Sequence, residues 1–570
     1  MAIIGIDLGT TYSLACYWEN GQIVMIPQEP EKENYLLPSQ VYIKEDNTII
    51  VGNDINSQNG ADKSDGKLFY SFKNFMGTNK QYVHNGIVYT PIDFSAMILR
   101  KIKENTEAYL QERNGEVVEE AIISVPAYFN DKQRSDTKKA AYIAGLHVER
   151  IINEPSAAAL MYRMGEKNKM QNLMVFDFGG GTLDISMVEC FENITEIVAI
   201  VGDNHLGGND IDLAIAKKYY EEQSKSGQYS QSPDFSELDE KEKLELLREA
   251  EKCKCGEKSI ISMDRDQMFY ACSEIFSKIK KLFDKILKDS EKEICEIDEL
   301  IMVGGSSKWK LVQEFMKELY HKAPVVLDRP DFAVAMGVGI YAGIRNRKED
   351  IKDLVLTDVC PFTLGTGVVS REHIPGVRKR LFPMIERNTT LPASVSHIFS
   401  TVDDYQSLIT IEVFQGEEYD VEKDVCLGQV TIDVPMRKAG ESSVFVTFCY
   451  DINGIIRVIV KNENNEEKDL LIANHEMSDQ ELKERLEKLK SLKTDLALED
   501  ERLREALEKL MLIYKIEHGR EREAVAGYIA ICENTLLHNR RVEKQRILEE
   551  VRQYIMEWEK ENEYLENITD

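Results

Sequence analysis

Two short segments of the chain share one design, and both carry residue types that could bind phosphate and a divalent cation. Each runs from an apolar stretch through an Asp into a turn with Gly and Thr, and then into a second apolar stretch: Ile3–Ser13 and Leu173–Asp184. Gly lets backbone N–H groups approach phosphate oxygens closely, and Thr hydroxyls add hydrogen-bond donors. Asp7 and Asp177 could hold Mg²⁺, usually through water, because this ion keeps much of its hydration shell. The two turns therefore indicate a duplicated lobe and a nucleotide triphosphate held between the copies.

A third segment, Leu300–Ser307, supports the same interpretation. Its sequence predicts a strand that runs into a turn at Gly304 and Gly305 and then into a helix. These Gly residues would allow a flat base or a ribose to approach closely. Each segment alone could be an ordinary turn, whereas the three together favour a nucleotide site. Neither GxxxxGKS nor GxxxxGKT occurs, which excludes a P-loop enzyme.

Two long stretches of different texture must position these residues. Residues 1–350 mix short apolar strands, amphipathic helices and Gly-rich turns, as in α/β layers. Residues 361–474 alternate apolar and polar positions, for example at Ile409 and Ile411, and are predicted to be all-β. Asn453-Gly454 predicts a hairpin turn within them.

Two shorter regions complete the organisation. Residues 475–570 are predicted to be helical, because a capping box at Ser478–Glu481 precedes Leu residues at helical spacing, and Gly519 could divide them into two or more helices. Residues 351–360 join the α/β region to the β region. Within them, Asp353–Asp358 is a short apolar stretch flanked by charges. It could be a buried strand, which its composition favours, or a linker that docks in one state and is released in another.

Composition limits the class of function. The chain has 71 Lys and Arg against 100 Asp and Glu, a formal net charge of −29, which disfavours a nucleic-acid or anionic-membrane binder. The ten Cys residues are scattered without a CxxC pair, which indicates a reducing compartment. Cys253 and Cys255 could be half of a metal site, but no second half lies nearby, so an ordinary helix is favoured. With no signal-peptide pattern and no apolar run of about eighteen residues, we expect a soluble cytoplasmic protein.

Five motifs of the α/β region carry a family resemblance: Gly5–Thr11, Ser124–Phe129, Ile151–Pro155, Phe176–Thr182 and Gly202–Gly208. In their order and spacing they match the 70-kDa heat-shock (DnaK-type) chaperones, which the chain resembles over essentially its full length. Within the family it looks most like the bacterial HscC branch, judged by Leu356–Pro361, Ile385–Thr390 and Tyr450–Gly454. The resemblance implies a multidomain protein: an actin-like α/β two-lobed ATPase domain over residues 1–350, a docking linker over 351–360, a β-sandwich peptide-binding domain over 361–474 and an α-helical lid over 475–570.

The resemblance also implies roles in catalysis. Asp7 and Asp177 match the family positions that hold Mg²⁺ through water, and Lys73 matches the lysine that orients the attacking water. A carboxylate near that water can serve as general base. The polar groups around the water are matched by Glu154, Asp177, Thr182 and Asp184. Taken alone, Lys73 could be a solvated surface lysine, and Glu154 could simply complement a helix N-terminus.

The implied cofactor is ATP or ADP with Mg²⁺, and K⁺ is a further candidate ion. The matching nucleotide contacts are Gly9, Thr10, Thr11, Gly179, Gly180, Gly181, Gly207, Gly208, Glu251, Lys254, Gly304, Gly305, Ser306, Lys308 and Asp331. The base pocket departs from the family pattern. Cys255 stands where an Arg is usual, Lys308 replaces the Arg that lies against adenine, and Trp309 replaces a small aliphatic residue. Because Lys lacks the flat guanidinium that stacks on a ring, we expect weaker nucleotide retention than in a typical member.

In the β region, the resemblance implies a pocket that takes one apolar side chain of an extended peptide held by main-chain hydrogen bonds. The matching residues are Phe399, Ile409 and Ile411 in the pocket, Val369 and Val402 in the arch over the peptide, and Leu364 and Thr366 at the rim. Alternatively, these residues only fill a sandwich core. The family usually has Met and Ala at the arch and a smaller residue in place of Ile409. We therefore expect a shallow pocket that favours small apolar side chains over Leu or Phe.

The resemblance further implies coupling between the two regions and a set of partners. Leu354–Leu356 matches the apolar linker whose docking couples ATP binding to lid opening, and Thr357 replaces a further Leu, so we expect weaker coupling. Arg150 and Pro126 match positions tied to J-domain contact and to relay of the nucleotide state. The implied partners are unfolded or extended polypeptides and a J-domain co-chaperone, and the need for a nucleotide exchange factor stays open.

Three functions compete at this point. The first is an ATP-dependent molecular chaperone for protein folding and stress response, in which ATP hydrolysis controls binding and release of extended apolar segments. The second is a small-molecule kinase on the same actin-like fold, since fold alone does not fix function. The region after residue 360 favours the chaperone, because a peptide clamp needs it and a kinase does not. The third is a non-hydrolysing relative, and the complete set of matched catalytic residues argues against it.

Overall fold

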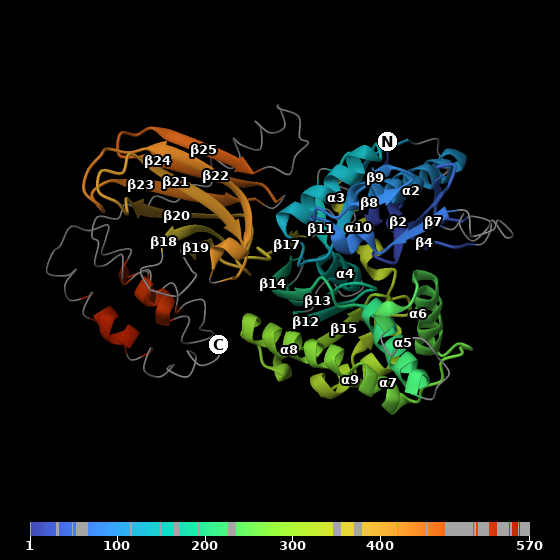
Figure 1. The fold of residues 1–570 in the computed structure, drawn as a ribbon. Coiled ribbons are helices and arrows are strands. Elements are labelled where there is room, and N and C mark those ends of the chain that lie inside the picture. Colours follow the sequence, from blue (N-terminus) through green and yellow to red (C-terminus); the bar gives the residue numbers. More distant parts are fainter. Residues whose placement is uncertain are drawn as a thin grey trace. The chain divides into compact units, whose positions relative to one another are not determined.

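A computed structural model describes residues 2–29, 33–47, 49–52, 66–113, 117–148, 150–164, 170–191, 194–225, 235–345, 355–369, 379–418, 420–451, 454–472, 506, 509–510, 513, 524–529, 531–532, 547, 550–556 and 558 (Figure 1). The chain divides into two units: Met1–Pro361 with Asn474–Glu476, and Phe362–Ala473 with Met477–Asp570. Each unit is described below by itself.

Two sheets with the same strand order form the centre of the first unit. The first sheet has the order β11-β10-β1-β2-β3 and the second β16-β15-β12-β13-β14-β17. In both, the strand that carries the motif Asp runs parallel to one neighbour and antiparallel to the other. The strands of the first sheet are β1 (Ala2–Asp7), β2 (Tyr12–Glu19), β3 (Gln22–Ile26), β10 (Val118–Val125) and β11 (Ile151–Asn153), with β4 (Leu37–Pro38) paired to β2. Those of the second are β12 (Gln171–Phe178), β13 (Leu183–Phe191), β14 (Ile194–Asp203), β15 (Glu299–Val303), β16 (Val325–Val326) and β17 (Val355–Thr357).

The repeated order agrees with the duplication that the sequence indicates. It places Asp7 at the end of β1 and Asp177 near the end of β12, at equivalent points of two equivalent sheets. Smaller sheets β6-β5-β7 and β8-β9 extend the first lobe. Their strands are β5 (Gln40–Lys44), β6 (Ile49–Val51), β7 (Gly66–Tyr70), β8 (Tyr82–His84) and β9 (Ile87–Tyr89).

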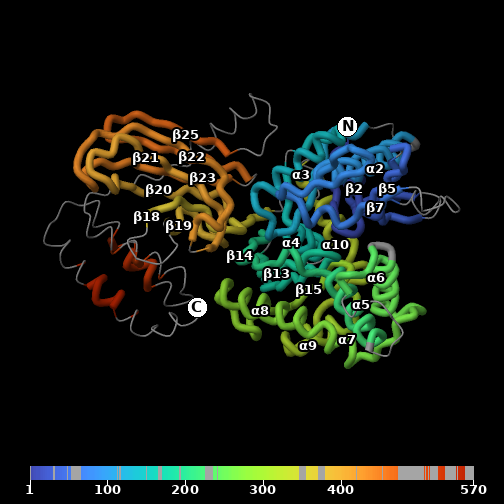
Figure 2. Tube along the Cα trace, viewed as in Figure 1, coloured from blue at the N-terminus to red at the C-terminus, as the bar shows by residue number. Residues whose placement is uncertain are grey.

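Helices α4 (Glu154–Arg163) and α10 (Ala333–Arg345) cross closely at the inner side of these sheets, and Figure 2 shows them side by side. A Cβ atom at Gly337 would lie 1.8 Å from the Ala157 carbonyl oxygen, so this crossing requires Gly. The other helices near the first sheet are η2 (Phe72–Phe75), α2 (Pro91–Arg113) and α3 (Asp131–Ile143).

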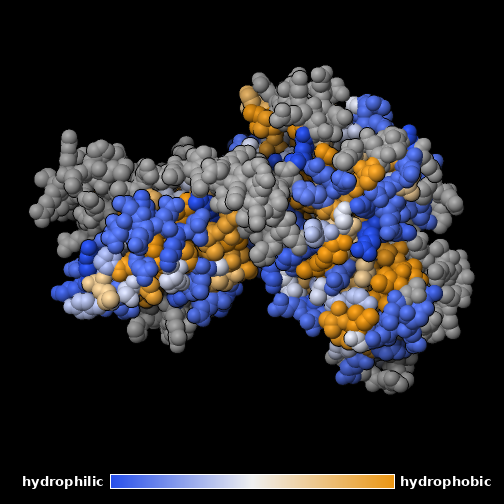
Figure 3. Space-filling view, turned by 90° about the horizontal axis from the view of Figure 1, so that it is seen from above, coloured by the Kyte–Doolittle hydropathy of each residue, from blue (hydrophilic) through white to orange (hydrophobic). Residues whose placement is uncertain are grey.

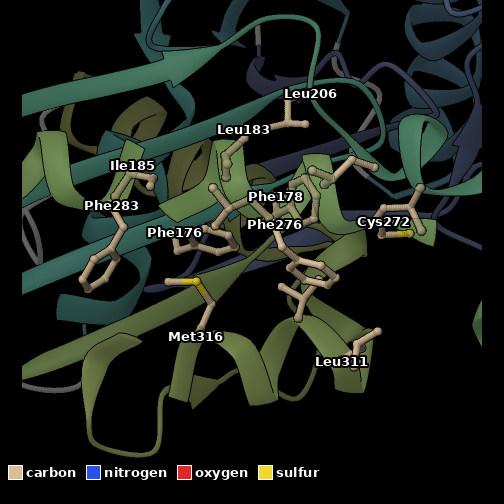
Figure 4. Close-up of a cluster of buried hydrophobic side chains, with 14 of the residues drawn as sticks. Phe176, Phe178, Leu183, Ile185, Leu206, Cys272, Phe276, Phe283, Leu311 and Met316 are labelled. Carbon is tan, nitrogen blue, oxygen red and sulfur yellow. The ribbon is translucent and has the colours of Figure 1, made fainter. Parts of the chain in front are cut away.

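The second sheet has its largest apolar core on the face that helices α8 (Ser273–Ser290) and α9 (Lys310–Tyr320) cover. Figure 4 shows Phe176 and Phe178 of β12 beside Phe276 of α8, with Met316 of α9 below them. All four side chains are buried. The remaining elements of this lobe are α5 (Gly208–Lys225), η3 (Phe235–Glu237), α6 (Glu240–Cys255), α7 (Arg265–Ala271), η4 (Ile294–Glu296) and η5 (Gly305–Lys308).

The stretch between the α/β and β regions forms strand β17 at the edge of the second sheet. It pairs in parallel with β14, where Val355 lies opposite Ile194 and Leu356 opposite Thr195. Leu356 packs against the apolar core, whereas Val355 is 47% exposed. The segment is thus an edge strand with one half-exposed side chain, while Leu354 lies outside the described residues.

Two four-stranded antiparallel sheets form the sandwich of the second unit, in the orders β19-β18-β21-β22 and β20-β23-β24-β25. In β21, Ile409 and Ile411 are buried and Thr410 between them is exposed, which is the alternation that the sequence predicts. Gly454 lies between β23 and β24 with a φ of 79°, and Asn453 falls outside the described residues. The elements are β18 (Leu364–Val369), β19 (Lys379–Ile385), β20 (Ala393–Ser400), β21 (Leu408–Gln415), η6 (Val421–Lys423), β22 (Val425–Asp433), β23 (Ser443–Tyr450), β24 (Ile456–Asn462) and β25 (Glu467–Ile472).

After residue 472, every residue that the structure describes is helical. These residues form an apolar cluster that includes Leu510, Val525 and Val551, and Ile398 of β20 packs against it. The predicted capping box at Ser478–Glu481 and the break at Gly519 lie outside the described residues. Within the part that is described, no helix is long and apolar enough to cross a membrane. Hydrophilic residues cover much of the visible face in Figure 3, with hydrophobic patches between them.

Candidate active site

Four carboxylates meet where the two central sheets approach each other. Asp7 ends β1, Glu154 is the first residue of α4, and Asp177 lies directly opposite Asp184 in the β12–β13 pair. The Ser124 hydroxyl donates to Asp7 Oδ1 over 2.8 Å, and the Tyr128 backbone N–H donates to Asp184 Oδ1 over 3.2 Å. The structure therefore brings together all the acidic residues that the sequence predicts for catalysis.

Lys73 joins these carboxylates from the 3₁₀ turn η2. Its Nζ lies 2.8 Å from Glu154 Oε1, and its side chain is buried, with 4% exposure for the residue. The Phe129 ring lies beneath it, with Nζ 5.6 Å from the ring centroid. The interpretation of Lys73 as a solvated surface lysine is therefore wrong. Glu154 both begins a helix and pairs with Lys73, so its two interpretations are compatible.

The burial of this cluster shifts its proton affinities. Burial raises the pKa of Asp7 to about 7 and that of Asp184 to about 8, and it raises the pKa of Asp177 well above the usual range of an Asp. The negative charge of Glu154 adds to the rise at all three carboxyls, and the positive charge of Lys73 opposes it. One lysine does not compensate four carboxylates, so the site favours protons or an added cation.

Two carboxylate oxygens are free to face such a cation. Asp177 Oδ2 and Asp184 Oδ2 are buried and have no hydrogen-bond partner among the described residues. No three His, Cys, Asp or Glu side chains in the described part converge closely enough to ligate a metal directly. Both observations fit Mg²⁺ that keeps its water shell and is held by carboxylates through that water.

The two Gly-rich turns lie directly against each other beside this cluster. A Cβ atom at Gly180 would lie 2.0 Å from Thr11 Oγ1, and one at Gly181 would lie 2.8 Å from Thr10 Cγ2. Side chains at these positions would force the turns apart, so the approach requires Gly. The contact also shows that the two predicted phosphate turns, one from each lobe, share one location.

Four further predicted nucleotide contacts surround the second turn. The backbone N–H of Gly208 donates to the Gly179 carbonyl over 3.0 Å, and the Ser306 hydroxyl donates to the same oxygen over 2.7 Å. Gly304 adopts a φ of 82°, and a Cβ there would lie 2.5 Å from the Phe178 carbonyl oxygen. The last of these contacts, Gly207, packs against the peptide group of Gly180.

On the side predicted to hold the base, two lysines form ion pairs with Asp residues. Lys254 Nζ lies 2.7 Å from Asp212, and Lys308 Nζ lies 3.0 Å from Asp331. Glu251 and Cys255 are exposed on α6, and the Trp309 ring stacks on Phe276 with 6.2 Å between centroids. Asp212 was not predicted as a site residue, because nothing in its local sequence marks a carboxylate that pairs with a lysine on another helix.

A second missed feature connects β17 to the carboxylates. Asp358, which follows β17, accepts hydrogen bonds from Asn153 Nδ2 over 2.8 Å and from the Ser156 hydroxyl over 3.2 Å. Arg134 Nη2 donates to Asn153 Oδ1 over 2.6 Å. Asn153 directly precedes Glu154, the ion-pair partner of Lys73. One hydrogen bond and one peptide bond therefore connect Asp358, after the edge strand, to that ion pair.

The two positions predicted to serve in J-domain contact and in relay of the nucleotide state lie in the same lobe. Pro126 is buried directly after β10, and the Arg150 guanidinium lies over the Tyr341 ring, 4.7 Å from its centroid.

The predicted peptide residues lie on both sheets of the sandwich. Leu364 and Thr366 of β18 and Ile409 and Ile411 of β21 are buried in adjacent strands of one sheet. Phe399 lies on β20 of the other sheet, and its ring contacts that of Phe382 with 5.2 Å between centroids. The predicted arch residues, Val369 and Val402, are 52% and 55% exposed. Because they are exposed, Val369 and Val402 do not merely fill the sandwich core. The buried residues of the predicted pocket, in contrast, also fit the core-filling interpretation.

Comparison with known protein families shows to which family the chain belongs. The family model described as Hsp70 protein matches residues 3–85 and 80–561. The chain belongs to the Hsp70 family. Hsp70 proteins are ATP-dependent chaperones that bind nucleotide, usually with Mg²⁺, and the two-lobed α/β part and the β-sandwich fit this family. The small-molecule kinase alternative receives no support from the match.

The raised carboxyl pKa values predict how stability depends on pH. The folded protein binds more protons than the unfolded chain between about pH 4 and pH 8, so its free energy of unfolding falls as pH rises through this window. Asp184→Asn removes one buried carboxylate. Without nucleotide and Mg²⁺, we expect this variant to be more stable than the wild type at pH 8 by on the order of 2 kcal/mol, and equally stable near pH 4.

Denaturant unfolding followed by circular dichroism measures this difference. Asp266→Asn on α7, at an exposed position, is the matched control and should leave the pH dependence unchanged. Equal pH dependence for wild type and Asp184→Asn would contradict the charge balance described here.

Proposed function

We propose that this Hsp70 hydrolyses ATP at the carboxylate cluster and uses the reaction to control binding and release of extended apolar segments of unfolded proteins. The observation that carries the proposal is the buried Lys73–Glu154 ion pair beside Asp7, Asp177 and Asp184. Burying so many acidic groups is costly unless a cation completes the site.

In this proposal each residue of the cluster has one task. Asp7 and Asp177 would hold Mg²⁺ through water, and the ion would neutralise phosphate charge when bound. Lys73 orients the attacking water, and its ion pair with Glu154 fixes where its ammonium group points. Thr182 and a carboxylate of Glu154 or Asp184 accept hydrogen bonds from that water. Catalysis then consists mainly of positioning and electrostatic stabilisation.

The base side of the site supports weaker nucleotide retention than in a typical member. Lys308 is bound to Asp331, and about half of its side chain is exposed. An ammonium group in this position supplies a point charge but no flat surface for an adenine ring. Glu251, Lys254 and Ser306 remain the proposed contacts to the adenosine part.

Coupling between the site and the sandwich would run through β17. The strand is held by three backbone pairs to β14 and by the Asp358 carboxylate, which binds Asn153 next to Glu154. Release of β17 would therefore remove the acceptor of Asn153 Nδ2, leave Arg134 as the remaining partner of Asn153, and relax the start of α4. This is a reciprocal link between nucleotide state and linker docking.

The sandwich would grip one apolar side chain beside Phe399, Ile409 and Ile411, beneath the exposed Val369 and Val402. We further propose that the helical region acts as a lid, that a J-domain co-chaperone stimulates hydrolysis, and that the protein works in the cytoplasm as a member of the HscC branch. The net charge of −29 supports a polypeptide client over nucleic acid.

Single-turnover ATP hydrolysis tests the catalytic assignment. We expect Lys73→Ala to slow hydrolysis by about 10²–10³-fold with Mg²⁺ present, because it removes a preorganised charge from the reacting centre. Lys80→Ala, which changes an exposed lysine at the end of the same loop, should stay within about twofold of the wild type. Wild-type hydrolysis by Lys73→Ala would refute the role of the ion pair.

Peptide stimulation of hydrolysis tests the coupling. We expect replacement of Val355 and Leu356 by Asp to abolish the stimulation while basal hydrolysis persists, because buried charge prevents β17 from docking on β14. Replacement of the exposed Val83 and Val88 by Asp is the matched control and should leave stimulation intact. Stimulation that survives in the β17 variant would remove linker docking from the mechanism.

A further inference from the structure

Ser71, which directly precedes the turn that carries Lys73, has an unusual backbone. Its φ of 52° and ψ of 22° place it in the left-handed region, which residues other than Gly, Asn and Asp rarely adopt. Such a conformation persists only where the surroundings hold it. The contacts of Ser71 therefore bear directly on where Lys73 points.

One contact of Ser71 comes from the other lobe. Asn209, the second residue of α5, donates from Nδ2 to Ser71 Oγ over 3.2 Å. The backbone N–H of the same Asn209 donates to the Gly180 carbonyl over 2.8 Å. A single residue thus connects the phosphate turn of the second lobe to the Lys73 turn of the first.

Asn74 makes the matching contacts on the other side of Lys73. Thr10 Oγ1 donates to Asn74 Oδ1 over 3.4 Å, at the turn of the first lobe. A Cβ atom at Gly181 would lie 2.6 Å from Asn74 Oδ1, so the amide also lies against the turn of the second lobe. Lys73 is thus flanked by two uncharged residues: Asn74, which lies against both phosphate turns, and Ser71, which is linked to the second turn through Asn209.

We propose that Ser71 and Asn209 are positioning residues for hydrolysis. Their side-chain hydrogen bond, called the latch below, makes the orientation of the Lys73 side chain depend on the position of Gly180. The inference rests on the proposed role of Lys73. A movement of Gly180 displaces Asn209 through the hydrogen bond from the Asn209 backbone N–H. The side-chain amide of Asn209 then carries this displacement to Ser71. Because the latch is neutral, it adds no charge to a site that already holds four carboxylates and one lysine.

The test uses variants of the full chain with Mg²⁺ and ATP. Ser71→Gly accepts the left-handed backbone and removes the hydroxymethyl side chain that accepts the hydrogen bond, and Asn209→Ala removes the donor. We expect each to slow single-turnover hydrolysis about tenfold, with the ATP dissociation constant within about twofold of the wild type. The double variant should be no slower than either single one, because both break the same contact.

A conservative variant and a control separate positioning from general damage. Ser71→Asn tolerates the left-handed backbone and supplies an acceptor oxygen, so it should recover most of the rate. Asn85→Gly changes another left-handed residue (φ 49°), whose side-chain amide donates within the first lobe to Lys44, Glu45 and Asn47, and should have no effect.

Three results would overturn the latch: wild-type rates in Ser71→Gly, an effect of about a hundredfold in the double variant, or an equal loss in Asn85→Gly. A wild-type protein that does not hydrolyse ATP at all would instead refute the proposed function on which the latch rests.

Discussion

The burial of four carboxylates around one lysine is the constraint on which the rest of the structure depends. Taken from water, these groups repel one another, and the pKa of Asp184 rises to about 8 as a result of burial and of Glu154. The negative charge of the cluster can be relieved by protons or by a bound cation. The site therefore combines a fixed backbone with negative charge that the one lysine does not compensate. Mg²⁺ bound with a nucleotide would supply the missing positive charge.

The duplicated sheets provide that rigidity. Equivalent strands end at Asp7 and Asp177, and Gly at 180 and 181 lets the two turns come within van der Waals distance. The same sheets also offer an outer edge at β14, to which β17 adds a strand. Asp358, directly after that strand, accepts a hydrogen bond from Asn153, so the connecting segment contacts the layer that fixes the carboxylates.

Much of this could be predicted from local sequence, because strand, turn and Gly patterns are local. Contacts across the fold could not. Lys73 has no local pattern that distinguishes a buried lysine from a solvated one, and its partner Glu154 lies 81 residues away. The bonds from Asn153 to Asp358 and from Asn209 to Ser71 span 205 and 138 residues. The sequence of β17 fits both a strand and a linker, and the pairing with β14 is a tertiary contact that composition does not contain.

Proton exchange on nucleotide binding measures the central claim most directly. Calorimetric titration of ADP with Mg²⁺ at about pH 7, in two buffers of different ionisation enthalpy, gives the number of protons released. The account predicts net release, because carboxyls with raised pKa lose protons when a cation neutralises the cluster, and it predicts a smaller release from Asp184→Asn. Binding with no proton exchange, or with proton uptake, would contradict it.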